Sequence, residues 1–370
     1  MEEILGGRFD MIVAAKLNET YLQLSCEKHI SYELNEYFAF KVPNAQFHPK
    51  VRAKMWDGKI RLFNMQTGQL YLGLLPYLKE WADKHTYKLQ TDIIDARHLK
   101  EGDVEKIKEF FDSLNLHCKN KPIIPRDYQI ASFLKCVSND RALLLSPTSS
   151  GKSLVIYALI RWYQKFLDDD KILILVPTVN LTTQMYGDFG DYSSHDKWNV
   201  EEQCHKIYSG KEKTANQQIY ISTWQSLHRL PKEYFEQFSL IVGDEAHLAT
   251  AQAMKGILEK ATSCRYRFGT TGTLTDCKTN KLVLEGLFGK TYKAITSKDL
   301  MDNKHISKLN IQCLQLEYPE VERKAMNKKT YKEEIDFIVS HPKRNNFICN
   351  LALEQKGNTL ILFNYVEKHG

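Results

Sequence analysis

Residues 146–153 read SPTSSGKS, which combines small side chains, a glycine and a lysine at a spacing suited to binding phosphate. An apolar run precedes this segment and a helical pattern follows it, so a tight loop would join a strand to a helix N-terminus. Backbone N–H groups of such a loop, with the positive end of the helix, surround anionic oxygens. Lys152 adds a positive charge for the β and γ phosphates of a nucleotide, and the Ser153 hydroxyl can ligate Mg²⁺. The alternative interpretation is a serine-rich turn without a ligand.

Ser146 stands where such a loop usually carries glycine. The position requires only a small side chain, so we expect nucleotide binding to be retained. The residues expected to surround the phosphates are Pro147, Thr148, Ser149, Ser150, Gly151, Lys152 and Ser153.

A pair of carboxylates follows a second apolar run, where residues 243–247 read GDEAH. In an open α/β sheet the carboxyl ends of the strands face the ligand crevice, so this pair would lie near the phosphate loop. Asp244 suits a Mg²⁺ site shared with Ser153, and Glu245 suits orientation of an attacking water. An isolated acidic pair can instead cap a helix N-terminus. The phosphate loop upstream favours the catalytic interpretation.

The elements that must position these groups alternate between short apolar runs and helical stretches from about residue 119 to 303. The runs are ALLL at 142, KILILVP at 171, QIYIS at 218, SLIVGDE at 239 and RYRFGT at 265. Helical stretches at 153–166 and 179–189 fit between them. This alternation predicts an α/β domain with a largely parallel, buried sheet.

Two further zones flank the predicted α/β domain. Residues 1–118 contain short alternating segments and one helical pattern at 99–116, and a proline-containing run follows them. Residues 304–370 contain a charged helical stretch at about 329–349 and the strand-like run TLILF at 359–363. We therefore predict three domains, 1–118, 119–303 and 304–370, the first of them a small α+β domain.

Five basic residues within a twelve-residue span concentrate positive charge in the first zone, opposed there only by Asp57. They are Lys50, Arg52, Lys54, Lys59 and Arg61. If residues 50–54 are extended and a turn follows at 56–58, these side chains line a basic hairpin. Such a surface would bind nucleic-acid phosphates with strong salt dependence and little sequence preference. The alternative is a solvated, charged hairpin face.

Composition excludes several classes of protein. A chain of 370 residues with 43% hydrophobic and 26% charged residues is typical of folded globular domains, not of a disordered chain. No apolar run approaches the ~20 residues of a membrane-spanning helix, and the N-terminus lacks the basic start of a secretory signal. Eight scattered cysteines without Cys-x-x-Cys spacing favour neither a disulfide framework nor a zinc site, and we expect the reducing cytoplasm. The net charge of +6 is compatible with a polyanionic partner.

Five ordered segments, PTSSGKS, LVPTVNLTTQ, STWQSL, GDEAH and GTTGTL, resemble motifs I, Ia, Ic, II and III of superfamily 2 helicases. The resemblance implies a RecA-like domain that binds ATP and Mg²⁺. It implies catalytic roles for Lys152, Asp244, Glu245 and His247, and coupling of hydrolysis to movement by Thr271 and Thr273. It also implies contacts with the nucleic-acid backbone. The residues expected to make these contacts are Pro177, Thr178 and Thr223, with Trp224 either beside them or in the core.

Upstream of the phosphate loop, PRDYQ at 125–129 resembles the glutamine motif of the same helicases. A glutamine amide can pair with both N6 and N7 of adenine. Gln129, together with Arg126, is therefore predicted to contribute to ATP binding and selection. The alternative is a helix start that leaves Gln129 on the surface.

Three parts of the chain are together similar to the UvsW helicases of T-even bacteriophages. They are the segment with the five basic residues, the five helicase-like motifs, and KTYKEEIDFIVSHPKRNNFICNLAL at 329–353. This resemblance implies an ATP-dependent DNA helicase that unwinds branched DNA, regresses forks, migrates Holliday junctions and removes RNA–DNA hybrids in phage recombination, replication and repair. Its partners would be branched or double-stranded DNA, and its location the host-cell cytoplasm.

A second RecA-like lobe is expected to begin near residue 304, and 363–365 resemble motif IV, but motifs V and VI are missing. The resemblance implies that arginine fingers from a complete second lobe would close the ATP site. We expect the sequence to be a fragment, because a domain that ended after TLILF would leave an apolar strand with few partners. The alternatives are an ATP-gated nucleic-acid-binding fragment without efficient hydrolysis, an RNA helicase and a restriction-type DNA translocase.

Overall fold

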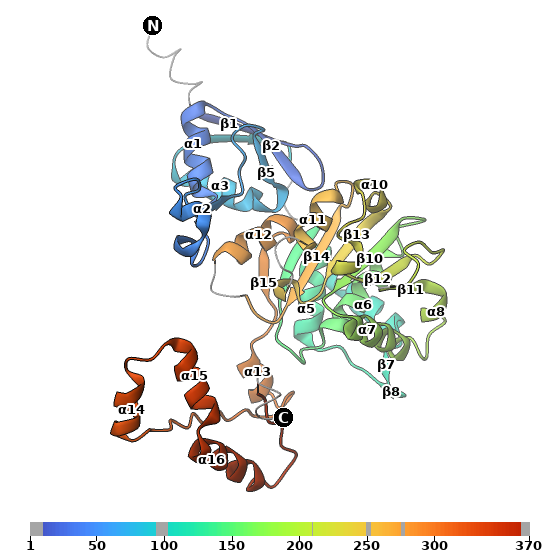
Figure 1. The fold of residues 1–370 in the computed structure, drawn as a ribbon. Helices are drawn as coiled ribbons and strands as arrows, with labels where there is room; N and C mark the ends of the chain where they lie inside the picture. The colour runs from blue at the N-terminus through green and yellow to red at the C-terminus, as the bar shows by residue number, and fades with distance from the viewer. Residues whose placement is uncertain (1–9, 94–102, 209, 249–252, 275–277, 364–370) are drawn as a thin grey trace. The chain divides into compact units, whose positions relative to one another are not determined.

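The computed structural model describes residues 10–93, 103–208, 210–248, 253–274 and 278–363 (Figure 1). The chain divides into two compact units, Met1–Ser307 and Lys308–Gly370. Among the helices of the described ranges, none is long and apolar enough to cross a membrane.

The N-terminal part of the first unit is built around a four-stranded sheet that packs against two of its helices. The strands are ordered β5 (Gln69–Tyr71), β2 (Tyr21–Ser25), β1 (Met11–Lys16) and β6 (Lys88–Thr91). All neighbours are antiparallel except β1 and β6. Alternate residues of β1 and β2 are buried, and they share a core with α1 (Lys28–Tyr37) and α3 (Leu75–Lys84). This period of two is that of a sheet with one face on the core.

The segment between β3 (Ala39–Lys41) and β4 (Lys59–Arg61) differs from the prediction. These two short strands pair with each other, and residues 42–58 form an insert that contains η1 (Ala45–Phe47) and α2 (Pro49–Arg52). The predicted extended conformation of 50–54, and with it the basic hairpin, is therefore wrong. Pro49 occupies the first helical turn, where its fixed φ is favourable, and the His48 ring accepts a hydrogen bond from Lys50 N at 3.2 Å. Both effects favour a helix start.

The central domain is built on a seven-stranded sheet in which every pair is parallel. Its strands, in spatial order, are β11 (Cys204–Ile207), β12 (Ile219–Thr223), β10 (Lys171–Val176), β13 (Phe238–Gly243), β14 (Tyr266–Thr271), β9 (Arg141–Leu145) and β15 (Thr291–Lys293). The predicted α/β domain with a largely parallel sheet is thus confirmed, as are its five predicted strands. The edge strands β11 and β15 are additional.

Both faces of this sheet are covered because successive residues of its strands point to opposite sides. Ile172, Ile174 and Val176 of β10 pack in one cluster with α5 (Asp127–Val137), α6 (Lys152–Tyr163) and α7 (Val179–Tyr192). Leu173 and Leu175 pack in the other cluster with α11 (Ala253–Lys260) and α12 (Lys278–Phe288). The second cluster continues into the core of the N-terminal part.

Smaller elements complete the first unit. They are α4 (Asp103–Ser113), β7 (His117–Cys118), β8 (Lys121–Pro122), α8 (Val200–Gln203), α9 (Trp224–Leu227), α10 (Lys232–Phe235), η2 (Leu72–Leu74), η3 (Ala246–Leu248) and α13 (Ser297–Asp302). In its described residues the second unit contains three helices, α14 (Glu320–Met326), α15 (Tyr331–Ser340) and α16 (Pro342–Leu353), and no strand. The strand predicted at 359–363 is therefore wrong. An apolar run becomes a strand only where a neighbour supplies backbone hydrogen bonds, and here Leu360 and Leu362 are exposed.

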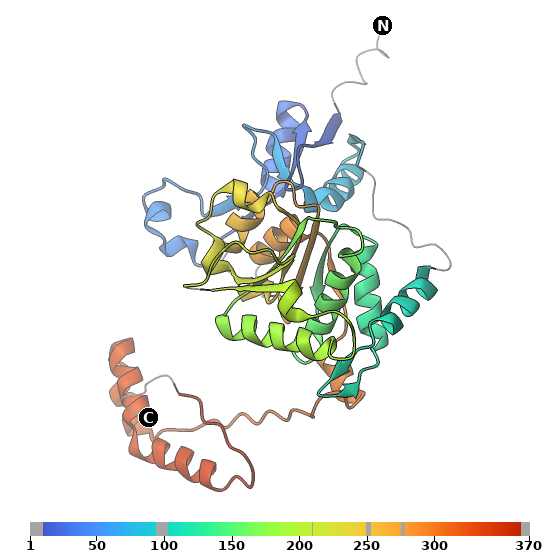
Figure 2. The same cartoon turned by 90° about the vertical axis from the view of Figure 1, so that its right-hand side faces the viewer.

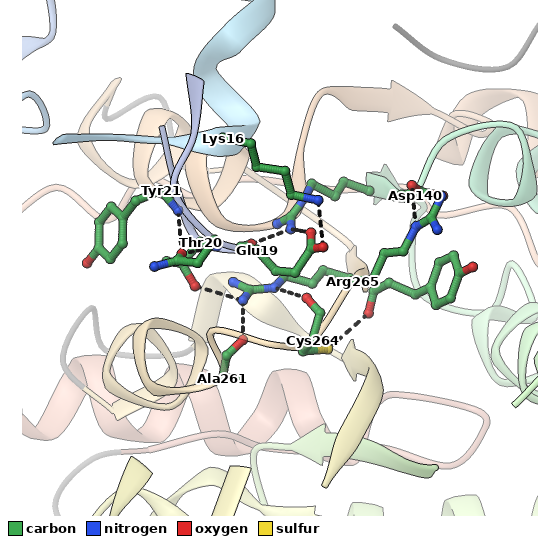
Figure 3. A network of polar contacts seen from close by, with 12 residues as sticks. Lys16, Glu19, Thr20, Tyr21, Asp140, Ala261, Cys264 and Arg265 are labelled. Atoms are coloured by element: carbon green, nitrogen blue, oxygen red, sulfur yellow. Dashed lines mark hydrogen bonds and ion pairs between the residues drawn. The ribbon is translucent and has the colours of Figure 1, made fainter. Parts of the chain in front are cut away.

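A network of polar contacts, which includes Thr20 and Ala261, joins the N-terminal part to the central domain (Figure 3). Arg267 of β14 is fully buried, and its guanidinium donates to the carbonyls of Cys264, Leu258 and Ala261. Its Nη2 also donates to Thr20 Oγ1, at 2.8 Å, in the loop that joins β1 to β2. Burial lowers the pKa of Arg267 to about 9, and nearby Arg141 adds to the effect.

Further polar contacts reinforce this junction. Arg141 forms an ion pair with Glu19 at 3.2 Å, and the hydroxyls of Tyr21 and Tyr71 donate to one oxygen of Glu259 at 3.0 and 2.6 Å. Gly73 of η2 lies so close to α12 that a Cβ there would be 2.7 Å from the carbonyl of Gly286. The N-terminal part is therefore packed onto the central domain by a buried, specific interface.

Candidate active site and nucleic-acid interface

The phosphate loop lies where the sequence predicts it, between β9 and the N-terminus of α6. Ser149 and Gly151 have φ of 65° and 79°, in the left-handed region, and a Cβ at Gly151 would collide with the Gln129 amide. Gly151 is therefore required both by conformation and by space. The hydroxyls of Ser146 and Ser150 lie 2.6 Å apart, and Ser150 donates to the carbonyl of Pro147 at 2.7 Å. Ser146, in the place of the usual glycine, thus stabilises the loop through its hydrogen bond with Ser150.

The ammonium group of Lys152 forms an ion pair with the carboxylate of Glu245. Both side chains are mostly buried, so water screens their attraction only in part. The other carboxylate oxygen of Glu245 lies 3.3 Å from Nδ1 of His247. Two of the predicted catalytic residues from distant segments are thereby in direct contact, at the carboxyl ends of β9 and β13.

A chain of contacts continues from His247 to β14. Nδ1 of His247 lies 2.7 Å from Thr271 Oγ1, and that hydroxyl donates to the carbonyl of Thr273 at 2.7 Å. Since Thr271 uses its proton on Thr273, Nδ1 must carry the proton that it shares with Thr271. The predicted coupling residues Thr271 and Thr273 are therefore linked to the predicted catalytic residue His247 through the N–H at its Nδ1.

Asp244 is held in a buried position with one carboxylate oxygen already bonded. Its Oδ1 accepts from Thr270 Oγ1 at 2.5 Å and from the backbone N–H of Glu245 at 3.0 Å. Burial raises the pKa of Asp244, while Thr270 and Lys152 oppose the rise. A cation at this carboxylate would relieve the cost of its ionisation.

The donor set fits Mg²⁺. Among the residues that the structure describes, no cluster of three or more His, Cys, Asp or Glu side chains could cage a metal. Mg²⁺ is usually held by one or two carboxylates together with substrate phosphates, which matches a single Asp244 beside a phosphate loop. Ser153 Oγ lies 2.9 Å from the hydroxyl of Tyr192 on α7, so metal binding through Ser153 requires it to exchange partners, and that role stays a prediction.

The glutamine motif at 125–129 is hydrogen-bonded to the phosphate loop. Gln129 is 5% exposed, so the alternative that placed it on the surface is wrong. Its Oε1 accepts from the backbone N–H of Arg126 at 2.8 Å, and its Nε2 donates to the Ser150 carbonyl at 3.0 Å. Pairing with adenine would require both bonds to exchange, and it stays a prediction. Tyr128, which was not among the predicted site residues, also donates to the Ser150 carbonyl at 2.8 Å; its place beside Gln129 is the only sequence signal.

The residues predicted to follow the nucleic-acid backbone gather at the carboxyl ends of adjacent strands. Val176 of β10 is in register with Thr223 of β12, so the residues after each strand meet at one edge. Of the three predicted contact residues, only Thr178 is exposed, and its side chain caps α7 by accepting from Leu181 N at 3.3 Å. Pro177 and Thr223 are buried. Trp224, 3% exposed, belongs to the core.

The five basic residues predicted to line a hairpin in the N-terminal part do not form one exposed group. Arg61 contacts Glu36 at 2.7 Å and Asp57 at 2.6 Å, and Lys59 forms an ion pair with Glu36. Arg61 holds the pKa of Asp57 down at about 2. These two cations are therefore neutralised within the protein, and they fix the base of the insert. The cations left exposed are Lys50, Arg52 and Lys54.

Comparisons with known proteins agree with this geometry. The family described as DNA helicase UvsW, N-terminal, matches residues 15–92, and Type III restriction enzyme, res subunit, matches 121–276. The ATP-dependent DNA helicase uvsW of Enterobacteria phage T4 is 34% identical over 360 residues, which cover 95% of this chain and 70% of that protein.

Two solved structures of the T4 protein resemble this chain. The crystal structure of the UvsW helicase from bacteriophage T4 has a TM-score of 0.70 at 33% identity and covers 76% of this chain and 99% of that one. A second crystal structure, of T4 UvsW, has a TM-score of 0.70 at 32% identity and covers 93% of this chain and 67% of that one. The likeness extends over both the N-terminal part and the central domain.

Proposed function

This chain belongs to the UvsW family of ATP-dependent DNA helicases, and from that premise we propose that it couples ATP hydrolysis to the remodelling of branched DNA. The proposed activities are unwinding, fork regression, branch migration of Holliday junctions and removal of RNA from R-loops, in phage recombination, replication and repair. The observation that carries the proposal is the contact chain from Lys152 through Glu245 and His247 to Thr271. It connects the site of hydrolysis to the segment expected to transmit movement.

In the proposed mechanism the phosphates of ATP compete with Glu245 for Lys152. Triphosphate oxygens in the loop offer Lys152 a stronger anionic partner, because backbone N–H groups and the N-terminus of α6 hold them there. Glu245 is then free to accept a proton from the attacking water. Mg²⁺, which we propose is held by Asp244 and Ser153, would neutralise charge on the β and γ phosphates. Release of Glu245 also changes what His247 faces, and His247 contacts Thr271.

We propose the same three domains as the sequence suggests, 1–118, 119–303 and 304–370. The first supplies nucleic-acid contacts through its exposed cations, and the second supplies the ATP site and a backbone contact at Thr178. The third is proposed to begin a second RecA-like lobe. Branched or double-stranded DNA is the proposed partner, RNA–DNA hybrids are a further proposed substrate, and the host-cell cytoplasm is the proposed location.

The test is ATP hydrolysis and strand separation on forked DNA by the parent protein and by Lys152→Ala. We expect fork-stimulated hydrolysis in the parent and its loss in the variant, because Lys152 is the only charge in the loop that reaches the terminal phosphates. Lys108→Ala, at an exposed position on α4, is the matched control and should behave like the parent. A Lys152→Ala protein as active as the parent would refute the proposed site.

The same assay separates the alternative functions. If ATP changes the affinity of the parent for DNA but is not hydrolysed, the protein is an ATP-gated binder. If a matched RNA fork competes better than the DNA fork, the substrate is RNA. A duplex that stimulates hydrolysis without strand separation would favour a translocase of the restriction type.

A further inference from the structure

The insert at 42–58 exposes large apolar side chains beside positive charge. Phe47 is 62% exposed and Met55 is 77% exposed, so this one insert presents two large apolar side chains to solvent. The guanidinium carbon of Arg52 lies 6.0 Å from the centre of the Phe47 ring, at the limit of a cation–π contact. In both overall views the insert projects from the N-terminal part (Figures 1 and 2).

The insert is a folded platform, so these side chains are held where they are. Its ends are closed by the β3–β4 pairing and by a bond from Val42 N to the Gly58 carbonyl at 2.8 Å. Gly58 has a φ of 76°, and a Cβ there would lie 2.9 Å from the Cβ of Ala45. The backbone N–H groups of Met55 and Trp56 both donate to the Lys50 carbonyl, at 2.9 and 3.2 Å.

Trp56 anchors the platform from inside. Its indole N–H donates to the Lys59 carbonyl at 2.8 Å, and its ring meets that of His48 edge-on at 5.4 Å. Trp56 is therefore the structural aromatic of the insert. Phe47 and Met55 are left outside this packing.

The charge of the insert selects a polyanion. Its exposed cations are Lys50, Arg52 and Lys54, and its one carboxylate, Asp57, is paired with Arg61. A partner must therefore offer negative charges and apolar surface together. Nucleic acid does so where its bases are not stacked, because each base then presents a flat apolar face next to its phosphate.

Intact duplex meets only half of this requirement. It presents phosphates to the three cations but keeps its bases stacked, so Phe47 and Met55 would stay in water or lie against charged backbone. A branch point offers unpaired or easily unstacked bases beside duplex phosphates. Exposed apolar side chains and exposed cations on the same insert match that requirement.

We propose that Phe47 and Met55 form an apolar wedge that packs against unpaired bases at a DNA branch point while Lys50, Arg52 and Lys54 bind the adjacent phosphates. This inference rests on the proposed function and deepens it, since it assigns recognition of the branch to one element. Lysine and arginine contacts with phosphate do not distinguish a fork from a duplex. Phe47 and Met55 would instead distinguish a fork from a duplex, because they contact only unpaired bases.

The experiment compares affinity for a fork with affinity for a fully paired duplex of equal length, over the same series of salt concentrations. Phe47→Ala should lower fork affinity roughly tenfold, as expected for loss of stacking on one base, and leave duplex affinity unchanged. Phe47→Trp should retain fork affinity. Lys50→Ala should weaken fork and duplex equally and lower the salt slope by about one. A 2-aminopurine at the branch should be quenched by the parent and not by Phe47→Ala.

Tyr32→Ala removes another half-exposed aromatic, from α1, and is the matched control expected to bind like the parent. Equal loss of fork and duplex affinity in Phe47→Ala, or no loss of either, would overturn the wedge while normal fork-stimulated hydrolysis left the proposed function intact. A parent that binds no fork would overturn both. If Phe47→Ala abolished self-association instead, the face would be a contact between copies and the wedge would be wrong.

Discussion

The buried junction between the N-terminal part and the central domain makes a quantitative prediction at Thr20. Thr20→Val keeps the shape of a side chain that is 1% exposed but removes its hydroxyl. The change breaks the 2.8 Å bond from Arg267 Nη2 and the 3.2 Å bond that the hydroxyl donates to the Leu258 carbonyl. That carbonyl keeps Arg267 Nη1 as a donor, but one N–H of a buried cation loses its acceptor. A hydrogen bond to a charged group contributes about 1.5–3 kcal/mol, so we expect the free energy of unfolding to fall by about 2–3 kcal/mol.

Urea unfolding of the parent and of Thr20→Val measures this change. The midpoint should fall while the slope m stays constant, because the surface exposed on unfolding is unchanged. Thr67→Val alters an exposed threonine of the same part and should remain within about 0.5 kcal/mol of the parent. If Thr20→Val lost no more stability than that, the Arg267 guanidinium would not need the Thr20 hydroxyl.

Three further predictions concern the site and its support. Burial raises the pKa of Asp244 above its ordinary 3.8. As pH rises from 3.8 through the raised pKa, the unfolded chain ionises more readily than the folded one, so the free energy of unfolding falls. The ionised carboxylate therefore remains destabilising at pH 7. Asp244→Asn should therefore raise the Tm at pH 7 while abolishing hydrolysis, and an unchanged or lower Tm would contradict this. Thr271→Val removes the hydroxyl that accepts from His247. This variant should retain ATP hydrolysis but lower strand separation per ATP by up to about tenfold. A parallel loss of hydrolysis and strand separation would argue against a coupling role for Thr271. Gly73→Ala should cost about 1–3 kcal/mol in urea unfolding because its Cβ has no space beside α12, and a neutral result would show that the interface can relax.

The sheet and the phosphate loop can be predicted from the sequence because each has a local cause. Central strands buried on both faces are continuous apolar runs, and the loop requires small residues and a lysine at fixed spacing. The edge strands β11 and β15 have only four and three residues, and their sequences CHKI and TYK carry no such run. Each of these two strands is defined by its pairing with a neighbouring strand, which the local sequence does not reveal.

Other features depend on contacts that no local pattern contains. The alternation of Lys50, Val51 and Arg52 suggests a strand, but a four-residue helix is too short to establish a period of its own. Arg267, inside an apolar run, is satisfied in part by Thr20, 247 residues away in the chain. Lys59 and Arg61 look like ligand-binding cations until Glu36 is brought beside them by folding.

The role of Glu245 as the general base is tested by the rate of ATP hydrolysis by Glu245→Gln in the presence of forked DNA. The variant keeps the size of the side chain and a partner for Lys152 but cannot accept a proton. We expect that it still binds ATP and that hydrolysis falls by about 10² or more, the usual contribution of a general base. Hydrolysis at the rate of the parent would contradict the assignment of this site.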